Sequence, residues 1–421
     1  MRTLACYWAT ALLCLASTTV HAQARTAHMT VYDAGVAEFL EERMVPLEPG
    51  MNQVEWRSLM PRALVRTLRI TADGADVVRQ EVVYDGPEVR NQRSPVLRLT
   101  LRNRGGTRDA RVQVDYLAPG LSWVADYSLV LDPADAGAPA TGGSLDAWVS
   151  LSNNTGADVH AGTVDLVAGE IALLSADGDA QQDYSANVSQ SRVNLESVSA
   201  SPPQAGASSI SAFSRFRLGR DIALNASAAM GRHPLFQGER IRIVQRNVFE
   251  NGYNQQTMGS GGFVLLPRGL DVRLVGTNPT GAAMPAGQVT VYARQDGPAQ
   301  VVGQDRISLT PAGGEFTLRQ GRSNTLFGTR RVLERSAEEY RTEQGRTREK
   351  LTTRVEVVVT NRGPRAAEVF VREGIEASGD NEWRVLTSSA EVERMSANTF
   401  QVRLQVPANG EASFTYTVES R

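Results

Sequence analysis

Short runs of alternating apolar and polar residues dominate this chain. The clearest run, Leu121–Leu131, reads LSWVADYSLVL, and such strict alternation predicts a β-strand with one buried face. At four places an alternating run meets a turn rich in Asn and Gly and is followed by a second alternating run. These turns begin at Asn103, Asn153, Asn278 and Asn361. Because Asn and Gly suit tight turns between paired strands, the repeated pattern indicates four β-hairpins.

Helical patterns are nearly absent, although two segments leave the choice open. Residues 36–47 have a Glu-rich middle that favours a helix, but Pro46 interrupts it, and we expect a strand and hairpin. Residues 330–352 mix Glu with Arg, as a surface helix or a pair of long solvated edge strands does. Gly345 argues against one unbroken helix there.

The strand pattern predicts an all-β, multi-domain protein of β-sandwich or immunoglobulin-like modules with few helices. We expect an N-terminal β-domain over residues 27–95, a central β-domain over residues 96–350, and a C-terminal immunoglobulin-like β-sandwich over residues 351–421. The central domain would carry a flexible, disordered insertion at about residues 177–213, where Ser, Ala, Gln, Gly and Pro replace the apolar positions.

The first residues have the features of a signal peptide. Arg2 precedes an apolar stretch at residues 9–20, which is shorter than a membrane-spanning helix. Small residues then allow cleavage after Ala22 or Ala24, so we expect a signal peptide over residues 1–22. A buried N-terminal strand or helix would not explain these features together. The sequence therefore predicts an exported bacterial protein, in the periplasm or associated with the outer membrane.

Composition adds limits on partners. The 421 residues include 44 basic and 46 acidic side chains, so nothing in the charge favours nucleic acid as a partner. Both cysteines, Cys6 and Cys14, lie in the predicted leader, which leaves the mature chain without disulfides and suits a bacterial periplasm. No later apolar run approaches about 20 residues, so no transmembrane helix is expected in the mature chain.

An ordered series of short motifs carries a family resemblance. The motifs are LSWVADY at 121–127, LSNNTG at 151–156, VAGE at 167–170, VVGQDRI at 301–307, TPAGGE at 310–315 and VVTNR at 358–362. Together they resemble the bacterial mucoidy-inhibitor-A-like family, whose C-terminal region is a domain of unknown function. The resemblance covers most of the chain from about residue 28. The resemblance implies the all-β fold and a location in the cell envelope, and it supplies no reaction or catalytic residues. This chain would be a short form, without the coiled-coil segment of longer relatives.

Candidate binding residues lie on and after the longest alternating run. Asp126 stands near Trp123 and Tyr127, so aromatic faces and a carboxylate could form a sugar-binding patch. Along a strand, however, Trp123 and Tyr127 share one face and Asp126 takes the other, which favours a core position for the two rings. Glu170 is a further carboxylate, at a strand end.

Other chemical signals are weak. His160 lies close to Asp158, where a His–Asp contact could orient a base, but a polar loop residue is the simpler interpretation. The Gly-rich run at 259–262 contains a serine without the G-x-S-x-G elbow. Asp177, Asp179 and Asp183 lack the terminal Glu of a Ca²⁺ loop. We therefore expect no catalytic residue, metal or cofactor that the sequence can identify.

Two functions stay open at this point. The first is a non-catalytic binding or structural module that contacts another envelope protein or a glycan. The alternative is an envelope glycan or peptide hydrolase that uses carboxylates such as Asp126 and Glu170, which would have to converge in one cleft. The missing catalytic motifs lean against an enzyme.

Overall fold

The computed structural model describes residues 26–89, 92–106, 108–134, 138–168, 214–227, 230–251, 264–294, 297–341, 345, 347–375 and 382–420. This part of the chain contains 24 β-strands and a single 3-10 turn, η1 (Val65–Thr67), which confirms the all-β prediction. No helix in these ranges is long and apolar enough to cross a membrane. The predicted leader, Glu170 and the insertion at 177–213 lie outside the described residues.

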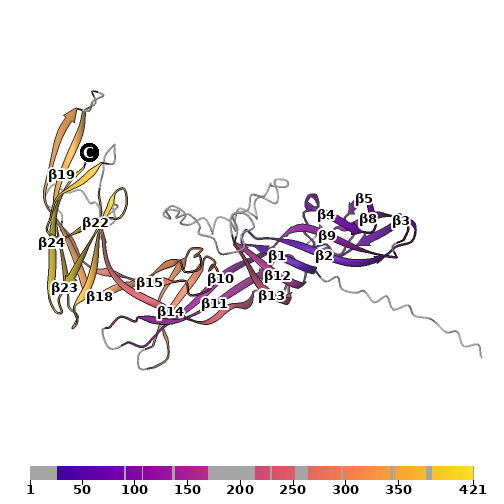
Figure 1. The fold of residues 1–421 in the computed structure, drawn as a ribbon, viewed down its shortest axis with the longest axis horizontal. Helices are drawn as coiled ribbons and strands as arrows, with labels where there is room; N and C mark the ends of the chain where they lie inside the picture. Colours follow the sequence, from indigo (N-terminus) through magenta and orange to yellow (C-terminus); the bar gives the residue numbers. More distant parts are fainter. Residues whose placement is uncertain are drawn as a thin grey trace, which may run out of the picture.

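The N-terminal body is a β-sandwich at one end of an elongated molecule (Figure 1). Its buried faces meet in one core, where Phe39 stacks on Tyr116 and Trp56 is fully buried. The larger sheet has six strands in the spatial order β13 (Ser214–Leu224), β12 (Val159–Ala168), β1 (Thr26–Tyr32), β2 (Val36–Pro46), β9 (Asp109–Pro119) and β4 (Arg69–Asp73). The smaller sheets are β3 (Gly50–Trp56), β8 (Val96–Asn103) and β5 (Asp76–Val83), and the short pair β6 (Glu88–Val89) and β7 (Gln92–Arg93).

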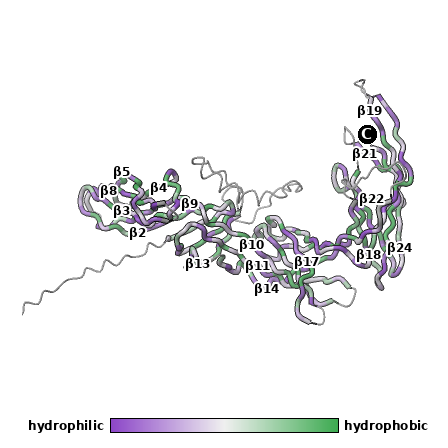
Figure 2. Tube along the Cα trace, turned by 180° about the vertical axis from the view of Figure 1, so that it is seen from behind, coloured by the Kyte–Doolittle hydropathy of each residue, from purple (hydrophilic) through white to green (hydrophobic). Residues whose placement is uncertain are grey.

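A second, 13-stranded sheet forms the rest of the molecule. Its main path runs β17 (Gln300–Ile307), β16 (Gly287–Ala293), β10 (Leu121–Leu131), β11 (Gly142–Asn153), β14 (Gly231–Asn251), β15 (Val264–Thr277), β18 (Glu315–Arg341), β19 (Thr347–Asn361), β24 (Glu411–Ser420) and β21 (Trp383–Ser388). Three more strands join through β14: β20 (Ala367–Gly374), β23 (Thr399–Val406) and β22 (Val392–Arg394). Apolar and polar residues alternate along these strands (Figure 2).

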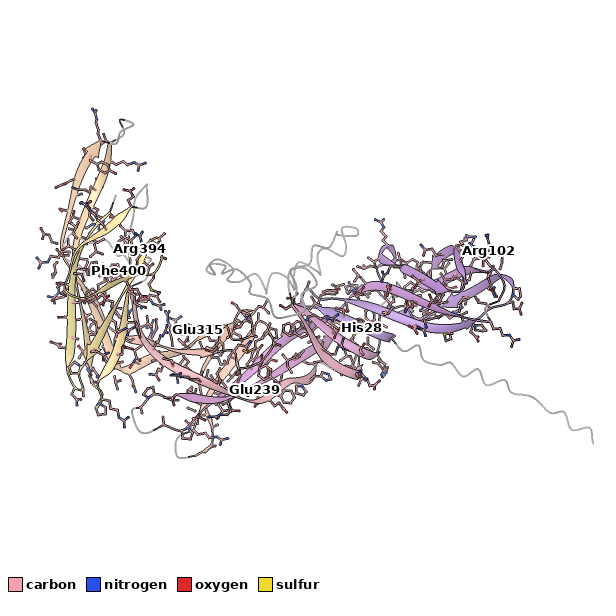
Figure 3. All side chains as sticks on the ribbon, viewed as in Figure 1. His28, Arg102, Glu239, Glu315, Arg394 and Phe400 are labelled. Atoms are coloured by element: carbon pink, nitrogen blue, oxygen red, sulfur yellow. The ribbon has the colours of Figure 1, made fainter. Side chains whose placement is uncertain are left out.

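The first part of this sheet curls back on itself. The Asp305 carboxylate of β17 accepts a hydrogen bond from the main-chain N–H of Arg319 on β18, at 2.6 Å. Gly303 allows this approach, because a Cβ there would lie 2.7 Å from the carbonyl oxygen of Gln320. Farther along, β19 and β24 pack on β20 and β23 and form the C-terminal body. Its separate core includes Val357, Phe400 (Figure 3) and Phe414.

Two unusually long strands connect the first part of this sheet, around β10 and β11, with the C-terminal body. β14 has 21 residues and pairs with β11 through its first half and with β15 and β20 through its second half. β18 has 27 residues and passes in the same way from β15 to β19. Continuous main-chain hydrogen bonding therefore runs from the strands around β10 and β11 to the C-terminal body.

Strand pairing crosses both of the domain limits that we expected. β8 begins at Val96 yet pairs with β3 and β5, and β19 spans residue 350 and pairs with β18. The two open segments are both strands where the structure describes them: residues 36–46 form β2, and residues 330–341 and 347–352 form the paired arms of β18 and β19. The edge-strand alternative was therefore correct for the charged segment.

The four predicted hairpins are wrong. β11 pairs with β10 and β14, whereas β12, after the Asn153 turn, pairs with β1 and β13. Likewise, the two strands do not pair with each other in β8 and β9, in β15 and β16, or in β19 and β20. Each turn thus connects two strands that do not pair with each other, and we call it a β-arch. The arches after β8 and β11 pass to another sheet, whereas those after β15 and β19 pass to another place in the 13-stranded sheet.

The Asn side chain explains how these turns connect strands that do not pair. The Asn153 amide donates to the carbonyl oxygen of Ala157, four residues on, and to that of Leu224 at the end of β13, both at 2.9 Å. Its own oxygen accepts from the main-chain N–H of Thr155 at 3.1 Å. Asn278 and Asn361 repeat this arrangement at their own arches. One buried side-chain amide therefore provides hydrogen-bond partners for main-chain groups of the turn and for a main-chain carbonyl of a distant segment.

Candidate functional site

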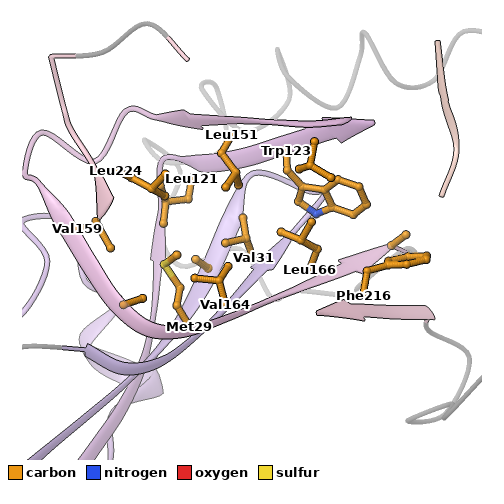
Figure 4. Close-up of a cluster of buried hydrophobic side chains, with 14 of the residues drawn as sticks. Met29, Val31, Leu121, Trp123, Leu151, Val159, Val164, Leu166, Phe216 and Leu224 are labelled. Atoms are coloured by element: carbon orange, nitrogen blue, oxygen red, sulfur yellow. The ribbon is translucent and has the colours of Figure 1, made fainter. Parts of the chain in front are cut away.

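The predicted aromatic pair lies in the core. Trp123 and Tyr127 are 5% and 2% exposed, as the alternation along β10 indicated. The Trp123 ring meets Phe216 edge-on at 6.2 Å between centroids (Figure 4). The Tyr127 hydroxyl donates to the carbonyl oxygen of Pro285 at 2.7 Å, and burial raises the pKa of Tyr127. Neither ring is available to stack on a ligand.

Asp126 faces the other way, and its aromatic neighbour is one that the sequence did not identify. Trp148 of β11 lies directly opposite Asp126 in the register. The Ser150 hydroxyl donates to the Asp126 carboxylate at 2.6 Å, and the Arg232 guanidinium lies 5.3 Å from the centre of the Trp148 ring. The registers of β10 against β11 and of β11 against β14 bring these groups together, so sequence spacing could not reveal them.

The other predicted candidates do not form a site with Asp126. Glu170, the serine of the 259–262 run and the Asp177–Asp183 group lie outside the described residues. Asp158 accepts from the main-chain N–H of Ala226. The His–Asp contact in the structure is a different one: the His28 ring lies 3.6 Å from the buried Asp165 carboxylate.

Glu41 is the centre of a buried cluster in the N-terminal body. Its carboxylate accepts from the Trp56 indole N–H at 2.6 Å and the Tyr116 hydroxyl at 2.7 Å, and also from Ser58. Burial raises the pKa of Glu41, and the hydrogen bonds from Ser58, Tyr116 and Trp56 offset only part of that shift. The cluster joins the two sheets of the sandwich.

A second buried carboxylate, Glu373, lies in the C-terminal body. It accepts from the Arg330 guanidinium at 2.9 Å and from the Tyr416 hydroxyl at 2.7 Å. Burial alone would lower the pKa of Arg330, but Glu373 and Tyr416 outweigh burial and raise it. Burial and the adjacent Glu373 raise the pKa of Tyr416. A cation, an anion and a phenol therefore hold β18, β20 and β24 together.

A polar pocket of about 420 Å³ lies on the sheet that this cluster supports. Four strands line it, namely β18, β19, β24 and β21. Its residues are Glu334, Ser336, Thr352, Arg354, Thr387, Thr415, Tyr416 and Thr417. Tyr416 thus belongs both to the pocket lining and to the buried cluster with Glu373.

Strand register explains the composition of the pocket. Glu334 lies opposite Arg354, which in turn lies opposite Thr417. The Thr387 hydroxyl donates to the Thr417 hydroxyl at 3.0 Å across β21 and β24. Successive strands therefore present one hydroxyl or charged side chain each to the same face.

The pocket offers both donors and acceptors. Five of its side chains, from one Ser and four Thr residues, carry aliphatic hydroxyls, and Arg354 and Glu334 add one charge of each sign. A ligand rich in hydroxyls matches this set, because each of its groups can both give and accept a hydrogen bond. We take this pocket as the candidate functional site.

Two comparisons with known proteins found no match. No protein-family model matches the chain, and no curated protein matches its sequence. Within the described ranges, no group of three or more His, Cys, Asp or Glu side chains is placed to hold a metal ion.

Proposed function

We propose that this chain is an exported cell-envelope protein that acts as a non-catalytic binding scaffold. Its ligand would be an envelope glycan, held in the polar pocket of the C-terminal body. The leader-like N-terminus and the resemblance to the mucoidy-inhibitor-A-like family support the location. The long strands β14 and β18 support the scaffold role, since they hold the C-terminal body, which carries the pocket, at a fixed place along an elongated molecule.

The observation that carries the ligand assignment is the row of hydroxyls around Arg354. Glycans are recognised by directional hydrogen bonds from side chains that are held in place before binding. Here the pocket lies on four hydrogen-bonded strands, and the Arg330–Glu373–Tyr416 cluster fixes two of them, β18 and β24, from within. The pocket is therefore preorganised.

Binding can be tested with purified fragments of bacterial envelope polysaccharides in calorimetry. Thr352→Val removes a pocket hydroxyl and keeps the shape of the side chain, so we expect affinity to fall about fivefold, which corresponds to ~1 kcal/mol for a hydrogen bond. Thr353→Val is the matched control, since Thr353 is next to Thr352 on β19 and does not line the pocket. Arg354→Ala should weaken binding further.

The outcomes separate the alternatives. Equal affinity of wild type, Thr352→Val and Arg354→Ala would remove the pocket from the proposal. Release of shortened glycan products, detected in the same mixtures, would instead favour a hydrolase.

Export is tested independently. N-terminal sequencing of the protein from a periplasmic fraction should find a chain that begins after Ala22 or Ala24. An uncleaved chain in the cytoplasmic fraction would contradict the envelope location.

A further inference from the structure

Three arginines form one row across neighbouring strands. Arg246 of β14 lies directly opposite Arg273 of β15, which in turn lies opposite Arg319 of β18. Directly opposed residues of an antiparallel pair project their side chains to the same face, with their Cβ atoms about 4.5–5.5 Å apart. Like charges in this position destabilise a strand pair. The fold therefore maintains this row at a cost in stability.

A fourth arginine, Arg372 of β20, lies beside this row. It is opposite Glu250 of β14, which is four residues from Arg246 on the same strand and therefore faces the same side. Burial and the nearby guanidinium of Arg273 lower the pKa of Arg372, and Arg246 lowers it further. Glu250 and Glu393 offset only part of that shift. Three guanidiniums are thus close enough to repel one another.

Contacts with neighbouring strands hold these side chains in place. The Arg246 guanidinium lies 5.7 Å from the centre of the Phe370 ring, which attracts a cation to its face. Arg372 donates to the side-chain oxygen of Gln401 at 3.0 Å. The Arg273 side chain is only 21% exposed. A guanidinium that is fixed and partly removed from water attracts an anion more strongly than one that moves freely in solvent.

A carboxylate already contacts one of these arginines. Arg273 donates to Glu250, so its guanidinium is placed to bind the oxygen atoms of an anion on this face. Arg319, at the end of the row, is paired differently, since it donates to the Asp271 carboxylate at 3.4 Å. The remaining three form what we call the arginine cluster: Arg246, Arg273 and Arg372.

We propose that the arginine cluster binds a phosphate group where β14, β15 and β20 meet. A phosphate monoester carries a charge of about −1.5 to −2 at pH 7 and three strong acceptor oxygens, more than a carboxylate offers. Guanidinium forks match these oxygens in geometry. A phosphate in this position would also remove the repulsion between Arg246 and Arg273. The cluster shares no residue with the polar pocket, so this site does not rest on the proposed function.

Inorganic phosphate is the probe for the site. It should raise the melting temperature of the wild-type chain more than sodium chloride does at the same ionic strength, because a ligand of the folded state stabilises that state. Arg246→Met keeps an apolar stem and removes the charge, so the affinity measured by calorimetry should fall about tenfold, as for a lost hydrogen bond between charged groups. Arg242→Met is the matched control, since Arg242 is exposed on the same strand and lies opposite Gly142 of β11.

Glu250→Gln should act in the opposite direction. It removes the carboxylate that competes for Arg273, so phosphate should bind about threefold more tightly. A gain of affinity cannot come from loss of folding, and melting curves without phosphate show that each variant is folded. Absence of phosphate binding to the wild type, or equal affinities of wild type, Arg246→Met and Glu250→Gln, would overturn the proposal.

Lipid vesicles identify the source of the phosphate group. Phosphatidylglycerol vesicles that compete with inorganic phosphate on the wild type, but do not bind Arg246→Met, would assign the site to a lipid headgroup. Phosphate binding that these vesicles leave unchanged would assign it to a soluble phosphate compound. Vesicles of phosphatidylcholine, which carry no net charge, control for binding to a bilayer as such.

Discussion

The side-chain amide of Asn361 donates a hydrogen bond to the carbonyl oxygen of Pro407, 3.0 Å away and 46 residues along the chain. Asn278 makes the equivalent bond to Pro311 at 2.9 Å, and Asn153 to Leu224 at 2.9 Å. In all three arches, the residue that starts the turn thus also binds a segment at or just after the end of a strand distant in sequence.

Removing one of these buried amides should lower the stability of the protein far more than removing a neighbouring exposed amide. Asn153→Ala removes the hydrogen bonds to the N–H of Thr155 and to the carbonyl oxygens of Ala157 and Leu224, so we expect a loss of about 1–3 kcal/mol in the free energy of unfolding. Asn154→Ala is the matched control, because Asn154 is exposed and bonds to Gly120 through its main chain. Urea denaturation measures both, and equal stabilities would contradict the role of Asn153.

Glu41 should make stability depend on pH. Its pKa is raised above the ordinary value of 4.5, so its contribution is complete below pH 4.5 and is lost as pH rises through the raised value. Relative to Glu41→Gln, the wild type should therefore lose stability as pH rises above 4.5. Denaturation of both proteins over a pH series measures the difference.

Glu55 provides the control of opposite sign. Hydrogen bonds from Arg57 and Arg98 lower its pKa, so its contribution is lost as pH falls. Because Glu55 is exposed, Glu55→Gln should change the pH profile only slightly and in the opposite direction. Parallel profiles for wild type and Glu41→Gln would show that Glu41 does not titrate as we infer.

Removing one partner of the Arg330–Glu373 pair should destabilise the protein strongly, whereas replacing both partners by apolar side chains should destabilise it much less. Arg330→Met leaves the fully buried Glu373 carboxylate without its cation, with an expected loss of about 3–5 kcal/mol. The double variant R330M/E373L removes both charges and should recover much of that loss. A double-mutant cycle by chemical denaturation checks this, and additive losses would contradict the coupling.

Gly328 allows the two long strands to pack closely. A Cβ at this position would lie 2.2 Å from the Phe249 ring, so Gly328→Ala should destabilise the C-terminal body by about 1–3 kcal/mol. Gly281→Ala is the control, since no atom lies within 4 Å of its added carbon. The two melting temperatures report the difference, and similar values would mean that Phe249 moves aside without cost.

The sequence alone determined where the strands lie and which of their faces are buried. Alternation placed β10 at residues 121–131 and assigned Trp123 and Tyr127 to one face, because side chains on a strand point to opposite sides in turn. It also located the Asn turns, since turn chemistry is local.

Only the tertiary structure decided which strands are neighbours. An Asn- and Gly-rich turn can join two strands that pair or two strands that do not, and the choice depends on a distant carbonyl such as that of Pro407. The partner of Asp126 proved to be Trp148, and the candidate pocket combines β18, β19, β24 and β21. Alternation fixes the faces of a strand but carries no information about its partners or register, and those depend on packing across the whole fold.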